Sequence, residues 1–257
     1  MRGLARTAAG LWVACASTVA ADVDAMVDAL GVPQLIAIFA SEGAQSGALI
    51  DQGMLNGQGG DVWAETVRRL YDPARMEQEM RASMAREVDP DVAAQALLFL
   101  QSDIGTKAID LEVQARQAFT NPDVEAAARA APAVQADAVT DFLATRDLID
   151  RNTDVAVDAR IAFFEGLIEG SGRGEMPDLD GLRAGIATET EGWLRGYYAL
   201  TQSAMTADEV AVLTAFWETD VGQAVDDALF VAFGQSYVTL SYGLGQAAGR
   251  LMPQNEL

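Results

Sequence analysis

Residues 205–224 read MTADEVAVLTAFWETDVGQA and residues 88–107 read VDPDVAAQALLFLQSDIGTK, so a similar pattern occurs twice, 117 residues apart. Both stretches have an acidic residue near the start, a phenylalanine in the middle and a polar-acidic-apolar-glycine ending. The matched pairs are Asp91 and Asp208, Phe99 and Phe216, Ser102 and Thr219, Asp103 and Asp220, Ile104 and Val221, and Gly105 and Gly222. Such self-similarity indicates two copies of one structural unit.

The shared pattern, Phe-x-x-[Ser/Thr]-Asp-[Ile/Val]-Gly, predicts a corner between two helices. The Ser or Thr can cap the free N–H groups of a helix that begins immediately after it, and the Asp adds negative charge at that helix's positive end. The glycine lowers helix stability, so we expect it to permit close approach between helices. We predict a structural role, with a binding surface as the alternative, for Phe99, Ser102, Asp103, Gly105, Phe216, Thr219, Asp220 and Gly222.

The rest of the chain also has helical periodicity. For example, apolar residues recur every four positions from Val221 to Phe233, whereas runs that alternate apolar and polar residues are few. We therefore predict an all-α fold, a compact helical bundle built from two duplicated helical modules. The expected organisation is a signal peptide at 1–21, module 1 at 22–120, a connector helix at 121–144 and module 2 at 145–257.

The first residues have the pattern of a secretory signal peptide. Two arginines, Arg2 and Arg6, precede an apolar stretch from about Ala8 to Ala20, and small residues follow. The apolar stretch is short compared with the ~20 residues that span a bilayer. We expect cleavage before Asp22 and a periplasmic location. Cys15 lies within this segment and lacks a convincing lipoprotein acceptor sequence before it.

The composition limits the partners that the protein can have. Half of the 257 residues are apolar, as in a globular protein, and the formal net charge is −21. Nucleic acid and anionic membrane surfaces are poor partners for such a chain, because Lys and Arg supply the affinity for phosphates. Basic proteins and metal cations are compatible with this charge, but solubility is the simpler explanation and the one we favour.

Most common catalytic arrangements lack their residues. The chain has no histidine, and its one cysteine is in the predicted signal peptide, so a Ser-His-Asp triad or a thiol nucleophile cannot form in the mature protein. A Ser–Lys dyad could use only Lys107, the sole lysine, with Ser102. Nucleotide-binding glycine motifs are missing. We predict no catalytic residue, no cofactor and no metal site.

Carboxylates are the remaining candidates for chemistry. Glu165 and Glu169 lie one helical turn apart, but a chain with 38 acidic residues contains such pairs by chance. The sequence Asp178-Leu-Asp-Gly181 resembles the start of a calcium loop, yet Leu182 and Arg183 follow where the loop needs an oxygen ligand and a glycine. Trp63, Trp193 and Trp217 fit a sugar site or a core equally well.

Residues 228–249 carry no charge and are long enough to span a bilayer. Glutamine, serine, threonine and several glycines make this segment only mildly apolar. We favour a central buried helix, with a helix that docks on a partner or at a membrane as the alternative.

The second copy of the repeated pattern, from Ala204 through Glu209 to Phe216 and Asp220-Val-Gly222, resembles bacterial domain-of-unknown-function family 2059. The resemblance covers about 50 residues of the second half. It is weaker in the first half, where Val88-Asp89-Pro90-Asp91 replaces the threonine-acid opening. The resemblance implies a periplasmic location and a helical fold, and it gives no activity to carry over to this chain.

These observations favour a non-catalytic periplasmic protein that works through contact with another envelope protein. A carboxylate-dependent hydrolase of envelope glycans and a membrane-surface protein are the alternatives. An enzyme predicts convergent acids with perturbed pKa values in a deep site, whereas an interaction module predicts an apolar patch or groove between the halves. The oligomeric state stays open.

Overall fold

The computed structural model describes residues 22–131 and 135–252, and the predicted signal peptide lies outside these residues. The described part consists of helices and connecting turns, without strands, so the prediction of an all-α compact bundle is confirmed. An N-terminal helix, Asp22–Ala29, comes first. It is followed by α2 (Val32–Met54), α3 (Gly60–Leu70), α4 (Pro73–Glu87), α5 (Pro90–Leu100), α6 (Asp103–Ala118), α7 (Pro122–Ala130), α8 (Ala136–Thr145), α9 (Leu148–Ser171), α10 (Leu179–Gln202), α11 (Ala207–Trp217) and α12 (Asp220–Leu251).

Local chemistry sets many of the helix starts. Asp72, Asp89 and Asn121 each cap the helix that follows, and a proline occupies the next position. Thr206 and Glu209 form a complete capping box at α11. Since all these signals are local, the helix boundaries follow closely from the sequence.

Helix bounds in the two halves follow the 117-residue spacing. Adding 117 to the bounds of α5, 90–100, gives 207–217, the bounds of α11, and α6 and α12 begin at 103 and 220. The halves differ further on, because α12 continues to Leu251 whereas α6 ends at Ala118. In the region of the predicted connector helix, α7 and α8 flank residues 132–134, which lie outside the described part.

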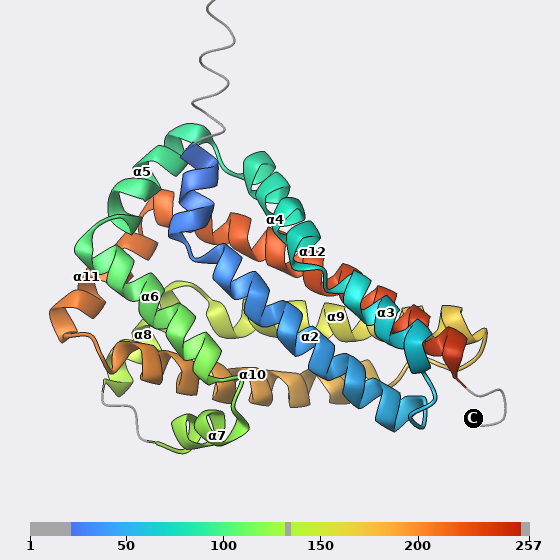
Figure 1. The fold of residues 1–257 in the computed structure, drawn as a ribbon. Coiled ribbons are helices and arrows are strands. Elements are labelled where there is room, and N and C mark those ends of the chain that lie inside the picture. The colour runs from blue at the N-terminus through green and yellow to red at the C-terminus, as the bar shows by residue number, and fades with distance from the viewer. Residues whose placement is uncertain (1–21, 132–134, 253–257) are drawn as a thin grey trace, which may run out of the picture.

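Four glycines allow the backbones of α9 and α12 to contact each other directly. A Cβ added at Gly166 would lie 2.8 Å from the backbone nitrogen of Gln246, and one at Gly249 would lie 2.7 Å from that of Ser171. Residue numbers rise together along both helices, so the two run parallel, and Figure 1 shows them side by side. The four glycines are Gly166, Gly170, Gly245 and Gly249.

The two halves share one hydrophobic core. Met26, Met84 and Leu100 from the first half and Phe142 and Val225 from the second are at most 2% exposed and belong to the same cluster. A smaller cluster around Trp63, Leu244 and Ala248 joins α3 to the end of α12. Neither half therefore buries its apolar surface without the other.

Candidate functional site

The repeated motif forms two matching helix corners. Ser102 Oγ accepts a hydrogen bond from the backbone N–H of Gly105 at 3.1 Å, and Thr219 Oγ1 accepts one from Gly222 at 3.0 Å. Asp103 and Asp220 are the first residues of α6 and α12, at the positive helix ends.

Each corner is tight enough to require glycine. A Cβ at position 105 would lie 2.8 Å from Leu100 Cα, and one at position 222 would lie 2.8 Å from Trp217 Cα. The backbone carbonyl of the motif phenylalanine would be closer still in both cases. Because the obstructing atoms belong to the backbone, no side-chain rotation relieves the contact.

The two corners meet each other. The rings of Phe99 and Phe216 stack with centroids 4.0 Å apart and an interplanar angle of 7°. Close by in the fold, Lys107 Nζ donates to both carboxylate oxygens of Glu209 at 2.8 and 2.9 Å, which joins α6 to α11. Since Lys107 is held by Glu209 and the Ser102 hydroxyl caps α6, the geometry gives a Ser–Lys dyad no support.

A cavity of about 270 Å³ lies between the two halves. Its walls come from α2, α6, α9, α10, α11 and α12, together with residues just before α2 and α9. Eight lining side chains are aromatic: Phe39, Trp193, Tyr197, Tyr198, Trp217, Phe230, Phe233 and Tyr237. The charged or amide side chains in the lining are Glu112, Arg116, Arg146, Asn152 and Asp226. A mostly apolar cavity with a few polar groups is typical of a small-molecule site.

Most charged groups around the cavity are paired. Arg146 and Asp226 form an ion pair in which the side chains are only 8% and 5% exposed, and Arg151 also binds Asp226, at 3.2 Å. Arg116 donates to both carboxylate oxygens of Glu42 through its two terminal guanidinium nitrogens, Nη1 and Nη2. Removing one member of a buried pair is costly because the remaining charge stays in a poorly solvated site.

Glu112 differs from these groups. Within the described part of the chain, its carboxylate makes no hydrogen bond and no ion pair, although its backbone carbonyl accepts a hydrogen bond from the Tyr197 hydroxyl at 2.8 Å. Burial raises the pKa of the Glu112 carboxyl, Arg146 opposes the rise, and Asp226 adds to it. Burial also raises the pKa of the neighbouring Tyr198 hydroxyl. The cavity therefore holds a carboxyl group whose charge has no direct partner.

Two buried donors near the cavity also lack an acceptor. Among the described residues, Trp217 Nε1 and Arg146 Nη1 are buried without a hydrogen-bond partner. The Arg146 guanidinium carbon lies 4.1 Å from the centroid of the Trp217 ring, so a cation–π contact partly compensates the missing hydrogen bond of Arg146, whereas the Trp217 N–H stays without an acceptor.

The other acidic candidates do not converge on this cavity. Glu165 and Glu169 are exposed on α9, and Glu169 accepts hydrogen bonds from Tyr242 and Gln246 of α12. Asp178 precedes α10, outside the cavity lining. In the described ranges, no group of three or more Asp, Glu, His or Cys residues is arranged to hold a metal ion.

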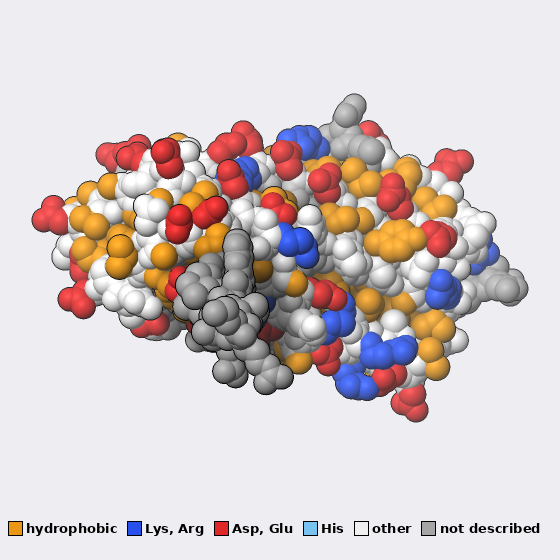
Figure 2. All heavy atoms as spheres, turned by 90° about the horizontal axis from the view of Figure 1, so that it is seen from above, with side chains coloured by type: hydrophobic (Ala, Val, Ile, Leu, Met, Phe, Trp, Pro, Cys, Tyr) orange, Lys and Arg blue, Asp and Glu red, His pale blue; other side chains and the backbone are white. Residues whose placement is uncertain are grey.

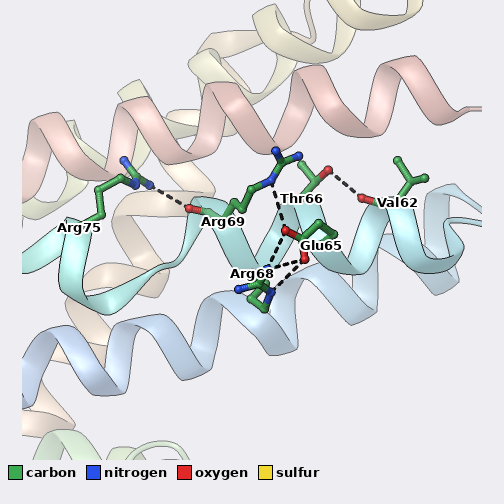
Figure 3. A network of polar contacts seen from close by, with 6 residues as sticks. All are labelled: Val62, Glu65, Thr66, Arg68, Arg69 and Arg75. Atoms are coloured by element: carbon green, nitrogen blue, oxygen red, sulfur yellow. Dashed lines mark hydrogen bonds and ion pairs between the residues drawn. The ribbon is translucent and has the colours of Figure 1, made fainter.

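Arginines on α3 and α4 form a surface network (Figure 3). Arg68 pairs with Glu65 at 2.6 Å, and Arg75 donates to the backbone carbonyl of Leu70 at 2.6 Å. Exposed pairs of this kind contribute ~0–1 kcal/mol. We interpret the network as local support for the turn between α3 and α4.

Figure 2 shows acidic side chains scattered across one face of the molecule, with apolar and basic groups between them.

The uncharged segment 228–249 lies within α12. Its residues Ala228, Ala232, Leu240, Leu244 and Ala248 are buried against neighbouring helices. None of the described helices is by itself both long enough and apolar enough to cross a membrane. The helices Asp22–Ala29 and Val32–Met54 reach that length and apolar character only when they are taken together, and they meet at a bend of 57°.

Sequence reasoning missed Glu112 and most of the aromatic wall. The sequence did hold one signal that these side chains share a helix face: Glu112 and Arg116 are four residues apart, and so are Trp193 and Tyr197. That spacing does not separate Glu112 from the other acidic residues. Comparison with protein-family models, curated proteins and solved structures gives no match to this chain.

Proposed function

We propose that the chain is a binding protein that takes a small, largely apolar molecule into the cavity between its two halves. The observation that carries this proposal is the cavity of about 270 Å³, with its aromatic walls and a carboxyl group that has no direct partner. Its volume is slightly below the ~300–1,000 Å³ of typical ligand pockets, so the ligand is small. Tyr237, 37% exposed, is the most exposed residue of the lining, and we infer that the cavity opens to solvent beside it.

A cavity-filling variant tests this proposal. Val155 lines the cavity, and one of its methyl groups lies 3.3 Å from where a Cβ on Gly234 would be, so Val155→Phe should occupy part of the space. Val212→Phe is the control, because Val212 is 45% exposed on α11. A library of small amphipathic molecules, screened by thermal shift, should yield compounds that stabilise the wild type and the control but not Val155→Phe. Equal stabilisation of all three proteins would refute the cavity as the site.

The proposal keeps the hypothesis of a non-catalytic protein and replaces an envelope-protein partner with a small molecule. The hydrolase alternative has weaker support, because Asp226, the second acid in the cavity, is held by two arginines. The membrane-surface alternative also has weaker support, because α12 packs against other helices along the segment 228–249.

We also propose export to the periplasm with cleavage before Asp22. The support is the signal-peptide pattern of residues 1–21 together with the burial of Val23, Met26 and Val27 immediately after the predicted cleavage site. The mass of the protein isolated from its host should correspond to a chain that starts at Asp22. A full-length mass would contradict cleavage.

Duplication of one helical module is the further part of this proposal. One support is that the first and last residues of α5 and α11 both differ by 117 positions. The matching caps at Ser102 and Thr219 and the stacking of Phe99 on Phe216 are the others. The similarity to bacterial domain-of-unknown-function family 2059 stays a prediction from the motif residues.

A further inference from the structure

We propose that the ligand of the cavity is a small organic cation, a protonated amine whose nitrogen binds the Glu112 carboxylate while its apolar body lies against the aromatic walls. This inference rests on the proposed binding function and specifies the chemistry of the ligand.

The first argument is the charge balance of the cavity. Arg116 is paired with Glu42, and Arg146 is paired with Asp226, whereas the Glu112 carboxylate has no ion pair in the described part of the chain. An unpaired carboxylate in a poorly solvated site is unfavourable. Glu112 is half-buried, so a ligand with one positive charge would give its carboxylate a partly desolvated, hydrogen-bonded partner, and charge-assisted hydrogen bonds of this kind are strong.

The second argument is that rings around the cavity already bind cations. The guanidinium carbons of Arg116, Arg146 and Arg151 lie 5.4, 4.1 and 3.9 Å from the ring centroids of Trp193, Trp217 and Phe230, respectively. All three rings line the cavity. Cations within about 6 Å of a ring centroid are attracted by the negative ring face. The faces that these arginines occupy are taken, but the five other aromatic rings of the lining offer the same kind of surface to an ammonium group and to apolar atoms.

The third argument concerns competing ligands. An anion would lie near the carboxylates of Glu112 and Asp226. Both arginines in the lining already have acidic partners, and Arg146 keeps one unpaired donor, Nη1, which a neutral acceptor can satisfy as well as an anion can. The formal net charge of −21 also raises the local concentration of cations and lowers that of anions. A neutral alcohol could donate a hydrogen bond to Glu112 but would leave its charge uncompensated.

Three probes of similar shape and different charge separate these possibilities. Calorimetric titration of the full protein would use 2-phenylethylamine, 2-phenylethanol and 3-phenylpropionate with the wild type, Glu112→Gln and Asp110→Asn. Asp110 is the matched control, because it is an exposed acid on the same helix and lies outside the cavity lining. We expect the amine to bind best to the wild type and the control and to lose at least tenfold in affinity in Glu112→Gln, with the alcohol nearly unaffected.

The outcomes distinguish the two levels of the proposal. Preferential binding of the alcohol or the acid, or equal binding of the amine to Glu112→Gln and the wild type, would overturn the amine inference and leave the binding function in place. Failure of all three probes to bind any of the proteins would count against the binding function itself.

Discussion

The glycine at the start of α12 gives a sharp test of the helix corner. A Cβ at Gly222 would lie 2.8 Å from Trp217 Cα and nearer still to the carbonyl oxygen of Phe216. Both obstructing atoms belong to the backbone at the end of α11. Gly222→Ala must therefore separate the end of α11 from the start of α12.

The cost follows from the contacts that this separation disturbs. Overpacking in a tight site costs ~1–3 kcal/mol. The Thr219 cap contributes ~1 kcal/mol, and the stack between Phe99 and Phe216 contributes ~0.5–1.5 kcal/mol. Alanine recovers ~1 kcal/mol because it favours a helix more than glycine does. We expect the free energy of unfolding to fall by about 1.5–4.5 kcal/mol.

Urea unfolding followed by circular dichroism measures this loss, with Gly185→Ala as the matched control. Gly185 is inside α10, and no atom lies within 4 Å of its added Cβ, so alanine should stabilise the protein there by ~0.5–1 kcal/mol. If Gly222→Ala were as stable as the wild type, or gained stability as the control should, the close-approach explanation of the motif glycine would be wrong.

Three further experiments test the contacts around the cavity and between the halves. Asp226→Asn should lose ~3–5 kcal/mol in urea unfolding, because it leaves Arg146 charged and buried, and a loss below 1 kcal/mol would contradict a strongly desolvated pair. Burial raises the folded-state pKa of Glu112, so the folded protein holds this proton more tightly, and its contribution to stability falls as pH rises from the ordinary value of 4.5 through the raised one. Glu112→Gln should therefore gain stability relative to the wild type as the pH rises above 4.5, and a difference independent of pH would contradict this. A double-mutant cycle of Phe99→Leu and Phe216→Leu should give a coupling energy of ~0.5–1.5 kcal/mol, and additive effects would argue against a stabilising stack.

The helical class and the two corners could be predicted because they depend on local chemistry. A hydroxyl that caps a helix, an acid in the first turn and a glycine near the preceding helix end all occur within a few residues of one another, as at Ser102 and Gly105. The contact between Phe99 and Phe216 is different in kind. It depends on how the two halves pack, and the repeat spacing alone does not specify that arrangement.

The cavity could not be predicted for a related reason. Glu112, Tyr197 and Asp226 come from α6, α10 and α12, and only tertiary packing brings them to one space. Nothing in the sequence distinguishes Glu112 from the other acidic residues, because its unusual feature is the missing partner. The close contact between α9 and α12 does have a signal in the sequence, because Gly166 and Gly170 have the same four-residue spacing as Gly245 and Gly249.

A crystal structure of the protein with 2-phenylethylamine tests the central claim most directly. The account predicts electron density for the amine inside the cavity, with its nitrogen at a hydrogen-bond distance of roughly 2.7–3.2 Å from the Glu112 carboxylate and its ring against Trp193 or Tyr197. Density for the amine only at the protein surface, or a cavity filled by the protein's own side chains, would contradict it.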